Sequence, residues 1–327
     1  MFSTVGSQAM NTLTKTLVTV YAPATVANLG VGFDILGMAL DAPGDLVTAE
    51  YSDSPGVHLL SITGDGGKLS TDPERNTACI AARETLRAMQ IQTGVQLRLD
   101  KGLPLASGLG SSAASAVAAA VAVNELYGAP LTEEQLLPAC IEAEAAVSGR
   151  HADNVAPALF GGIVLVLGTQ AGAIYRLPIP DQMVLALVTP DIALPTAQAR
   201  AVLPPVIPLH ALVAQTGLVA ALIHALHTND LELLGQAMQQ DAVVTPARAN
   251  LIPGLAEAQT AAREAGALAT VISGAGPTLC ALCSSPESAD DSARALGEVY
   301  DRLGIPSQTR IAYPNPIGAA VLPDSGP

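Results

Sequence analysis

Residues 103–114 read LPLASGLGSSAA, a loop rich in glycine and serine that leads into an alanine-rich segment. Glycine has no Cβ, so Gly108 and Gly110 allow positive φ angles and a close approach of the backbone to a ligand. The two serines that follow open a predicted helix through residue 127, whose first N–H groups have no partner within the helix. Free amides and the positive end of the helix dipole together favour a bound phosphate. The stretch therefore predicts an anion site, and a seryl hydroxyl of the first turn is placed to reach a phosphate-bound Mg²⁺.

Two better-known phosphate motifs do not fit this loop. A P-loop ends in Gly-Lys-Ser/Thr, but no lysine follows Lys101 in the chain. A dinucleotide fingerprint begins as its strand ends, whereas residues 102–107 separate the predicted strand 95–99 from Gly108. That fingerprint also expects an acidic residue about 20 residues after the loop, and Glu125 comes too early. The alternatives that remain are a phosphate site of another kind and a tight turn that only caps a buried helix.

The composition indicates a protein with few cations to bind an anionic ligand. The chain has 327 residues, enough for one large or two ordinary domains, and 50% of them are hydrophobic. Its formal net charge of −14 argues against nucleic acid or an anionic membrane as a partner, since both require a basic face. With 15 lysines and arginines in total, the chain would bind a phosphate through backbone amides, Mg²⁺ and a few well-placed arginines.

Cysteine usage and the N-terminal sequence predict a cytoplasmic protein. Cys280 and Cys283 lie in an apolar, strand-like run without a second pair, which favours buried thiols in a reducing compartment over a zinc or redox site. Residues 1–14 form a polar extension without the apolar segment of a signal peptide, and Met10 is an alternative start. The apolar run 155–168 is too short to span a bilayer and is interrupted by proline and glycine.

The first half of the chain has the pattern of a strand-rich layer followed by a βα unit. Strands are predicted at 17–21, at 46–51 and 57–62 as a hairpin-like pair, and at 95–99, with a helix over 77–89. The loop predicted at 22–34 carries Asn28 and Asp34 among glycine, proline and small residues. Such a loop fits a ligand-binding element, and it fits equally well a loop held together by Asx-turns.

A second polar stretch follows the next predicted helix, which begins after Thr132. Glu144 lies near the C-terminal end of that helix, where an acid opposes the helix dipole and must be solvated or held by a cation. Residues 148–157, SGRHADNVAP, come directly after it and precede an apolar strand at 161–167. Polar and charged groups between a helix and a buried strand indicate the wall of a site.

The second half again mixes strands and helices. Strands are predicted at 183–189, 270–273 and 278–283, and helices up to 226 and over 231–239, 253–266 and 286–303. This order predicts a second domain, with its sheet covered on one face, and an α+β class for the whole chain. We expect the first domain to span residues 1–180 and the second to span residues 181–327.

Four stretches resemble the ordered motifs of the GHMP small-molecule kinases. They are residues 23–34 (PATVANLGVGFD), the loop GLGSSAA, residues 151–157 (HADNVAP) and residues 273–278 (SGAGPT). The first and the third are similar to those of the homoserine kinase family in particular. The resemblance covers the chain from about residue 18 to residue 321.

This resemblance implies an N-terminal domain similar to the second domain of ribosomal protein S5 and a ferredoxin-like C-terminal domain, with the active site between them. It implies that Asn76 contacts the adenine side of ATP. The residues that would surround the phosphates are Pro104, Ser107, Gly108, Leu109, Gly110, Ser111 and Ser112. Ser112 and Glu144 would hold Mg²⁺, and Glu142 is the alternative ligand because the family usually has one more residue between this glutamate and the histidine.

The family pattern also implies a pocket for homoserine. Its members here would be Asn28, Asp34, His151, Asn154, Arg200 and Arg248. The residue types suit a zwitterion, because Asp34 offers an anion for the ammonium and the arginines offer forked cations for the carboxylate. Asn154 would orient the hydroxyl, and His151 would be a hydrogen-bonding wall rather than a base. Asp34 as the general base is the competing role.

The reaction that the resemblance implies is transfer of the γ-phosphoryl group of ATP to homoserine, in threonine biosynthesis. Such a transfer depends mainly on positioning and charge neutralisation, so no strong base is required, and Asn154, Ser112 and Glu144 form the expected catalytic set. Mevalonate, shikimate or a sugar is the alternative acceptor, and a non-catalytic nucleotide-binding relative is the alternative outside enzymes. The family also implies a possible homodimer.

Overall fold

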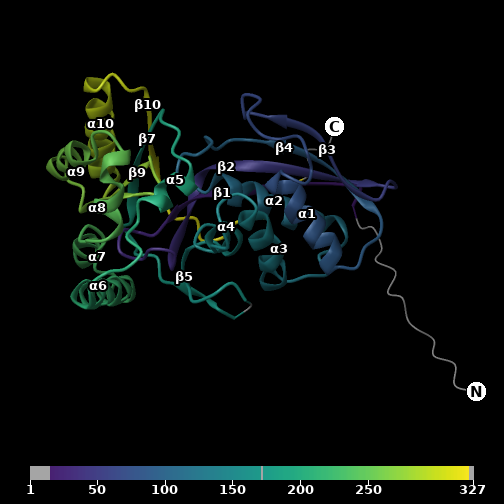
Figure 1. Cartoon of the computed structure of the whole chain (residues 1–327), viewed down its shortest axis with the longest axis horizontal. Coiled ribbons are helices and arrows are strands. Elements are labelled where there is room, and N and C mark those ends of the chain that lie inside the picture. The colour runs from purple at the N-terminus through teal and green to yellow at the C-terminus, as the bar shows by residue number, and fades with distance from the viewer. Residues whose placement is uncertain (1–14, 171, 324–327) are drawn as a thin grey trace, which may run out of the picture.

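The computed structural model describes residues 15–170 and 172–323, so the predicted extension at 1–14 lies outside the described residues. Two groups of strands and helices lie side by side along the long axis of the molecule (Figure 1). The strands of the first group are β1 (Leu17–Ala27), β2 (Leu36–Ser52), β3 (Gly56–Thr63), β4 (Gly94–Asp100), β5 (Ile163–Val166), β6 (Ile174–Leu177) and β11 (Ala320–Val321). Its helices are α1 (Thr77–Ala88), α2 (Ser111–Leu126), α3 (Glu133–Ala145) and α4 (Val155–Phe160).

The first sheet has the strand order β11-β1-β2-β4-β3, and β5 continues from β2 to β6. The predicted pairing of β2 with β3 as a hairpin is wrong, because β4 lies between them and pairs with β3 in parallel. The chain reaches that position through the crossover helix α1, which makes β3-α1-β4 a βαβ unit. Both arrangements give the same alternation of apolar residues, so the sequence pattern alone did not distinguish them.

The first predicted loop is shorter than expected, because residues 22–27 belong to β1. The pairing of β1 with β2 shifts register between Pro23 and Thr25, and such an irregularity is where a strand accommodates a proline. The loop proper begins at Asn28, which has a positive φ of 73°, as does Asp34 with 62°. The two side chains predicted to bind a ligand therefore lie in the short connection between β1 and β2.

α2 packs against β1 and β2 in the centre of the first group. Seven of its 16 residues are alanine, and Ala113, Ala116 and Ala120 are fully buried. Small side chains allow the helix to approach the sheet closely, and Gly110 at its N-terminus has the left-handed conformation predicted from the glycine. The core thus fixes the end of α2 that carries the phosphate loop, which we define as residues 102–110.

The second group contains a separate antiparallel sheet of order β10-β7-β9-β8. Its strands are β7 (Val184–Pro190), β8 (Ala269–Ile272), β9 (Leu279–Cys283) and β10 (Ser307–Ala312). Its helices are α5 (Thr196–Ala201), α6 (Leu209–Thr228), α7 (Leu231–Met238), α8 (Val244–Arg248), the 3-10 helix η1 (Ala249–Leu251), α9 (Leu255–Glu264) and α10 (Pro286–Arg302).

Both faces of this second sheet are covered, whereas the sequence predicted one. Val184 of β7 packs in a cluster with Leu255 of α9 and Leu296 of α10. Leu185, on the opposite face of β7, belongs to the main core together with Leu222 of α6. Cys280 and Cys283 are likewise buried in different clusters on β9, which confirms the prediction of buried thiols.

α6 has 20 residues and no charged side chain. Within the described residues it is the helix long and apolar enough to cross a membrane by length and composition, although core helices of soluble proteins pass the same test. Leu222, Ala225 and Leu226 pack into the core, whereas Leu209 is 75% and Val213 64% exposed. α6 therefore presents an uncharged, partly apolar face on the outside of the molecule.

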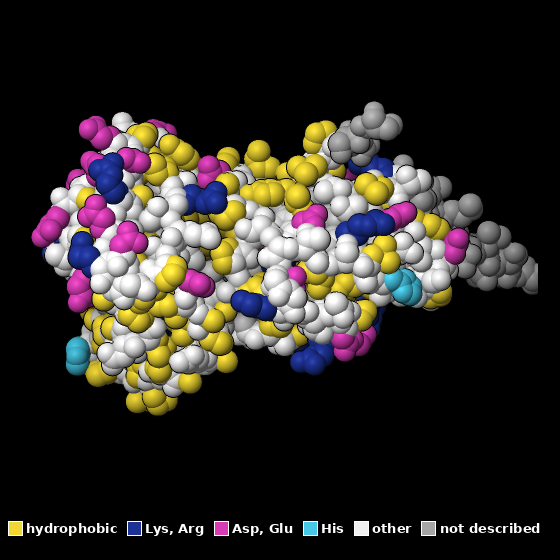
Figure 2. Space-filling model, turned by 90° about the horizontal axis from the view of Figure 1, so that it is seen from above, with side chains coloured by type: hydrophobic (Ala, Val, Ile, Leu, Met, Phe, Trp, Pro, Cys, Tyr) yellow, Lys and Arg dark blue, Asp and Glu magenta, His cyan; other side chains and the backbone are white. Residues whose placement is uncertain are grey.

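Charged side chains are unevenly distributed over the surface in Figure 2. Acidic side chains gather at the end of the molecule that carries α9 and α10, where α10 alone contributes Asp290, Asp291, Glu298 and Asp301. On the face that Figure 2 shows, acidic side chains are thus densest at this end of the molecule, and others are scattered over the rest of that face.

Candidate functional site

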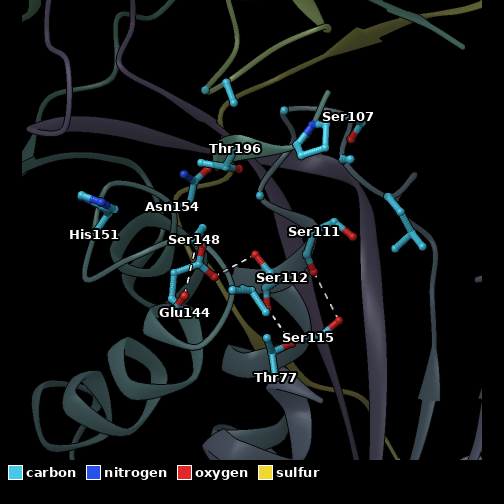
Figure 3. Close-up of a pocket in the computed structure, with 18 of the residues that line it drawn as sticks. Thr77, Ser107, Ser111, Ser112, Ser115, Glu144, Ser148, His151, Asn154 and Thr196 are labelled. Atoms are coloured by element: carbon cyan, nitrogen blue, oxygen red, sulfur yellow. Dashed lines mark hydrogen bonds between the residues drawn. The ribbon is translucent and has the colours of Figure 1, made fainter. Parts of the chain in front are cut away.

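A cavity of about 330 Å³ lies where the two groups of elements meet. Most of the residues predicted for the site line it, namely Asn28, Asp34, Asn76, Ser107, Gly108, Gly110, Ser111, Ser112, Glu144, His151, Asn154, Arg200 and Arg248. Pro104 and Leu109 do not, and Leu109 is buried in the core instead. Figure 3 shows Ser112 of α2 pointing toward Glu144 and Ser148, whereas the Ser111 side chain points away from them.

The phosphate loop has the backbone conformation predicted from its glycines. Gly108 has a φ of 84° and Gly110 one of 67°. A Cβ added to Gly110 would lie 2.1 Å from Thr25 Oγ1, and one added to Gly108 would lie 2.4 Å from the carbonyl oxygen of Ser273. Gly110 provides no side-chain cap to α2, so no capping side chain competes for the first amides of that helix. These amides are available to an anion.

The motif at 273–278 holds the phosphate loop from the other sheet. Ser273 Oγ donates to the carbonyl oxygen of Gly108 at 2.7 Å, and Thr278 N donates to the carbonyl oxygen of Ser107 at 3.1 Å. Ser107 Oγ in turn donates to the carbonyl oxygen of Pro104 at 2.9 Å. Two predicted motifs far apart in the sequence are therefore one interlocked structure.

Glu144 is the buried carboxylate of the phosphate end. Ser112 Oγ donates to its Oε2 at 2.8 Å and Ser148 Oγ donates to its Oε1 (Figure 3). Burial raises the pKa of Glu144, and the two seryl hydrogen bonds act in the opposite direction. Glu142 lies outside the cavity and forms an exposed pair with Arg150 at 2.7 and 2.8 Å. Glu144 reaches the first turn of α2 because it lies on the side of α3 that faces this helix.

These oxygen atoms fit a divalent cation. A carboxylate and a hydroxyl are hard donors of the kind that Mg²⁺ uses, and Mg²⁺ takes few protein ligands when substrate phosphates and water supply the rest. The described part of the chain has no cluster of three or more His, Cys, Asp or Glu side chains arranged for a metal. The Ser112–Glu144 pair, next to free helix amides, is the place in the cavity where such an ion would meet phosphate oxygens.

At the other end of the cavity, Asp34 and Arg200 form a forked ion pair. The Arg200 guanidinium donates to the two carboxylate oxygens at 2.6 and 3.0 Å, and His151 Nδ1 lies 3.5 Å from Asp34. Arg200 Nε is buried and has no hydrogen-bond partner among the described residues. A buried donor without a partner in a cavity is a functional indication. Burial lowers the pKa of His151, so the imidazole is neutral near pH 7.

Arg248 lies behind this pair and is 2% exposed. It donates from Nη1 to the carbonyl oxygen of Gly274 at 2.7 Å and from Nε to that of Ala199 at 3.1 Å. Both guanidinium groups lie near the Phe33 ring, that of Arg200 at 5.3 Å and that of Arg248 at 5.4 Å from its centroid. Burial, and then the neighbouring Arg200, lower the pKa of Arg248. Asp34 pairs with Arg200, and the charges of Asp241 and Asp153 also act on Arg248, so the two cations lie among three carboxyl groups.

The side chains of Asn28 and Asn76 are occupied by the backbone. Asn28 donates to the carbonyl oxygen of Gly274 at 2.9 Å and accepts from Asp34 N at 3.1 Å, which is the loop-holding role that the sequence left open. Asn76 caps α1 by accepting from Ala78 N at 3.1 Å. Both line the cavity. Asn154 differs from them, since its Oδ1 accepts from Thr25 Oγ1 at 2.7 Å and no helix cap occupies it.

Several residues of the site were not predicted from the sequence. Asp153 is 4% exposed, and burial followed by the charges of Asp34 and Glu144 raises its pKa to about 7. It was part of the predicted polar wall at 148–157 but was not singled out, although its place beside Asn154 was a usable signal. The helices α5 and α8, which carry Arg200 and Arg248, were also missed because 6 and 5 residues show no periodicity.

Comparison with known proteins gives consistent matches. The model described as GHMP kinases N terminal domain matches residues 76–162, and that described as GHMP kinases C terminal matches residues 222–302. A homoserine kinase of Chlorobium phaeobacteroides (strain BS1) is 42% identical over 297 residues, which is 88% of this chain and 92% of that protein. One of Arabidopsis thaliana is 47% identical over 290 residues, 87% of this chain and 78% of that protein. The crystal structure of homoserine kinase from Cytophaga hutchinsonii ATCC 33406 superimposes with a TM-score of 0.91 at 43% identity, and the match covers 94% and 98% of the two chains.

Proposed function

Because this chain belongs to the homoserine kinase family and has the two-domain α+β fold of the GHMP kinases, we propose that it transfers the γ-phosphoryl group of ATP to the hydroxyl of L-homoserine. The products are O-phospho-L-homoserine and ADP, and the reaction belongs to threonine biosynthesis. The observation that carries the proposal is a single cavity with free helix amides at one end and Asp34, Arg200 and Arg248 at the other. This distribution of charge matches a triphosphate facing an amino acid.

At the phosphate end, the residues of 107–112 that line the cavity would bind the ATP phosphates through their amides. Ser112 and Glu144 would hold Mg²⁺, which would neutralise phosphate charge, and the burial of Glu144 beside Ser112 supports this choice over the exposed Glu142. Asn76 would form part of the wall on the adenine side. Pro104 and Leu109 would support the loop without touching the nucleotide.

At the amino-acid end, Asp34 would bind the ammonium group and the two arginines the carboxylate. The orphaned Nε of Arg200 supports the second part, since a carboxylate would satisfy it. Asn154, oriented by Thr25, would hold the hydroxyl in line with the phosphoryl group. Neutral His151 would contribute a hydrogen bond. Asp34 is already paired with a guanidinium, which supports charge recognition over proton abstraction.

The test is ADP release by the purified protein with Mg²⁺-ATP and a panel of homoserine, mevalonate, shikimate and galactose. We expect turnover with homoserine alone. Turnover with another acceptor would retain the phosphate end and overturn the assignment of Asp34, Arg200 and Arg248. ATP binding without turnover on any acceptor would support the non-catalytic alternative.

We further propose that the protein acts in the cytoplasm as a homodimer, with domains at 1–180 and 181–327. The exposed apolar residues of α6 and of the segment before it support a second copy as the partner; they are Val206, Ile207, Leu209, Leu212 and Val213. α6 carries no charge in a chain of net charge −14, so two copies would meet there without repulsion. Light scattering on Leu212→Asp, with Leu303→Asp as an equally exposed control elsewhere, tests this surface.

A further inference from the structure

A buried ion pair at the base of the phosphate loop is not part of the proposed chemistry, although Lys101 is one of the residues that line the cavity. Lys101 follows β4 directly, and Asp45 lies within β2. Their side chains are 1% and 0% exposed, and the Lys101 ammonium contacts Asp45 Oδ2. Ser115 of α2 completes the cluster by donating to Asp45 Oδ2 at 2.7 Å and accepting from Lys101 Nζ at 2.8 Å.

This pair holds both ends of the phosphate loop. Asp45 Oδ1 accepts from the amides of Gly102 and Leu103 at 3.1 and 3.2 Å, where the loop begins. Lys101 Nζ donates to the carbonyl oxygen of Ser111 at 2.9 Å, where the loop passes into α2. The distance between the two ends of the loop is therefore set by one ion pair.

Stability alone is a weak reason for such a pair. Removing two charges from water costs free energy that their attraction offsets only in part, and well-packed apolar residues often serve a core equally well. Asp45 also neutralises Lys101, so the pair adds little net charge to the phosphate site. What the pair does supply is geometry, because every one of its hydrogen bonds beyond the cluster ends on the backbone of the loop or of the first turn of α2.

We propose that Lys101 and Asp45 are positioning residues that hold the phosphate loop open at the width required by the ATP phosphates. The inference rests on the phosphate role proposed above for residues 107–112. It assigns no contact between Lys101 and the nucleotide. It predicts that disturbing the pair weakens ATP binding and leaves homoserine binding unchanged.

The decisive variant is the double substitution Lys101→Met with Asp45→Leu, which removes both charges and leaves no buried ion unpaired. We expect its KM for ATP to rise about tenfold, because charge-assisted hydrogen bonds at both ends of the loop are lost. Its KM for homoserine should stay within about twofold of the wild-type value. Lys101→Met alone should impair ATP binding at least as much, since it leaves Asp45 buried without its partner.

Asn124→Ala is the matched control. Asn124 is equally buried on α2, at the opposite end of the helix, and binds Leu131 through both its amide atoms at 2.9 and 3.0 Å. It should lower the melting temperature without changing either KM. A double variant with a wild-type KM for ATP would overturn the inference. Ser112→Ala, measured in parallel, separates the two proposals: if it too leaves turnover unchanged, the phosphate site itself is wrongly placed.

Discussion

At the phosphate end of the cavity, polar side chains bind one another and the backbone and leave the helix amides free, whereas at the amino-acid end Asp34 and Arg200 bind each other. Ser112, Ser148 and Glu144 are already joined by hydrogen bonds, as are Lys101 and Asp45 below them. A triphosphate can therefore enter a site that is largely preorganised. A zwitterion would meet an existing ion pair there, with the Nε of Arg200 left without a partner among the described residues.

This difference affects what each substrate has to do. Homoserine would break one ion pair and form two, with its ammonium replacing Arg200 at Asp34 and its carboxylate taking Arg200 in exchange. An acceptor that took Arg200 through its carboxylate but had no ammonium would leave the partly buried Asp34 without that ion pair, which is a basis for rejecting such acceptors. The phosphate end has no comparable filter, because amides bind any suitably shaped phosphate.

The largest effect is expected from adding a methyl group to the preorganised end. Gly110→Ala places a Cβ 2.1 Å from Thr25 Oγ1, so the loop must move. A displacement of about 1 Å in a positioned group can cost about 10²-fold in rate, and we expect at least that loss in kcat/KM for ATP. Gly66→Ala is the control, since Gly66 has a similar φ of 62° and a Cβ there meets nothing within 4 Å. Equal kinetics for the two variants would contradict a preorganised loop.

Removing the arginine of the ion pair should act on the other substrate. Arg200→Ala leaves Asp34 without its partner and the substrate carboxylate with one cation fewer, so we expect the KM for homoserine to rise roughly 10²-fold. The KM for ATP should not change. The control in the same steady-state assay is Arg176→Ala on β6, which removes an exposed ion pair with Glu133. Unchanged homoserine kinetics in Arg200→Ala would refute the substrate assignment.

Asp34→Asn distinguishes ammonium recognition from base catalysis. The amide retains the shape of the carboxylate and loses its charge, so we expect the KM for homoserine to rise roughly 30-fold while kcat at saturation is retained. Steady-state kinetics over a wide homoserine range provide the measurement. A fall in kcat at an unchanged KM would instead make Asp34 the general base.

A smaller effect is expected where one side chain only orients another. Thr25→Val keeps the volume but removes the hydroxyl that donates to Asn154 Oδ1 at 2.7 Å. Loss of one such hydrogen bond should lower kcat about tenfold, with little change in either KM. The control is Thr19→Val in the same strand as Thr25, which removes a hydroxyl contact to Thr48 of β2. A shared loss in both variants would point to β1 rather than to Asn154.

The smallest expected effect is on the stability of the protein and on how it depends on pH. Burial raises the pKa of Asp153 to about 7, so the folded state retains a proton that the unfolded chain releases near its ordinary pKa of about 3.9. The free energy of unfolding therefore falls as the pH rises from about 4 to about 7. Asp153→Asn removes this loss, so its melting temperature relative to wild type should increase from about pH 5 to about pH 8. A pH-independent difference, as expected for exposed Asp191→Asn, would contradict the buried carboxyl.

The sequence was sufficient for features that local chemistry dictates. The positive φ at Gly108 and Gly110, the start of α2 and the unusual position of Glu144 follow from residue types and spacing. The pairing of β3 with β4 does not, because a crossover and a hairpin share one alternation. The family resemblance identified Arg200, but only the fold shows its pairing with Asp34, 166 residues away in sequence. The role proposed for Lys101 depends on contacts with two other elements, so it too could not be predicted from the sequence.

The short strand β11 has a consequence for how the protein can be made. Its residues Ala320 and Val321 pair with Tyr21 and Val20 of β1, so the edge of the first sheet is covered by a segment far from β1 in the sequence. During synthesis, this part of the β1 edge remains open until residues 320–321 have left the ribosome. Exposed strand edges template aggregation, so deletions or fusions that disturb this C-terminal segment should reduce soluble yield even though the cavity is distant in sequence.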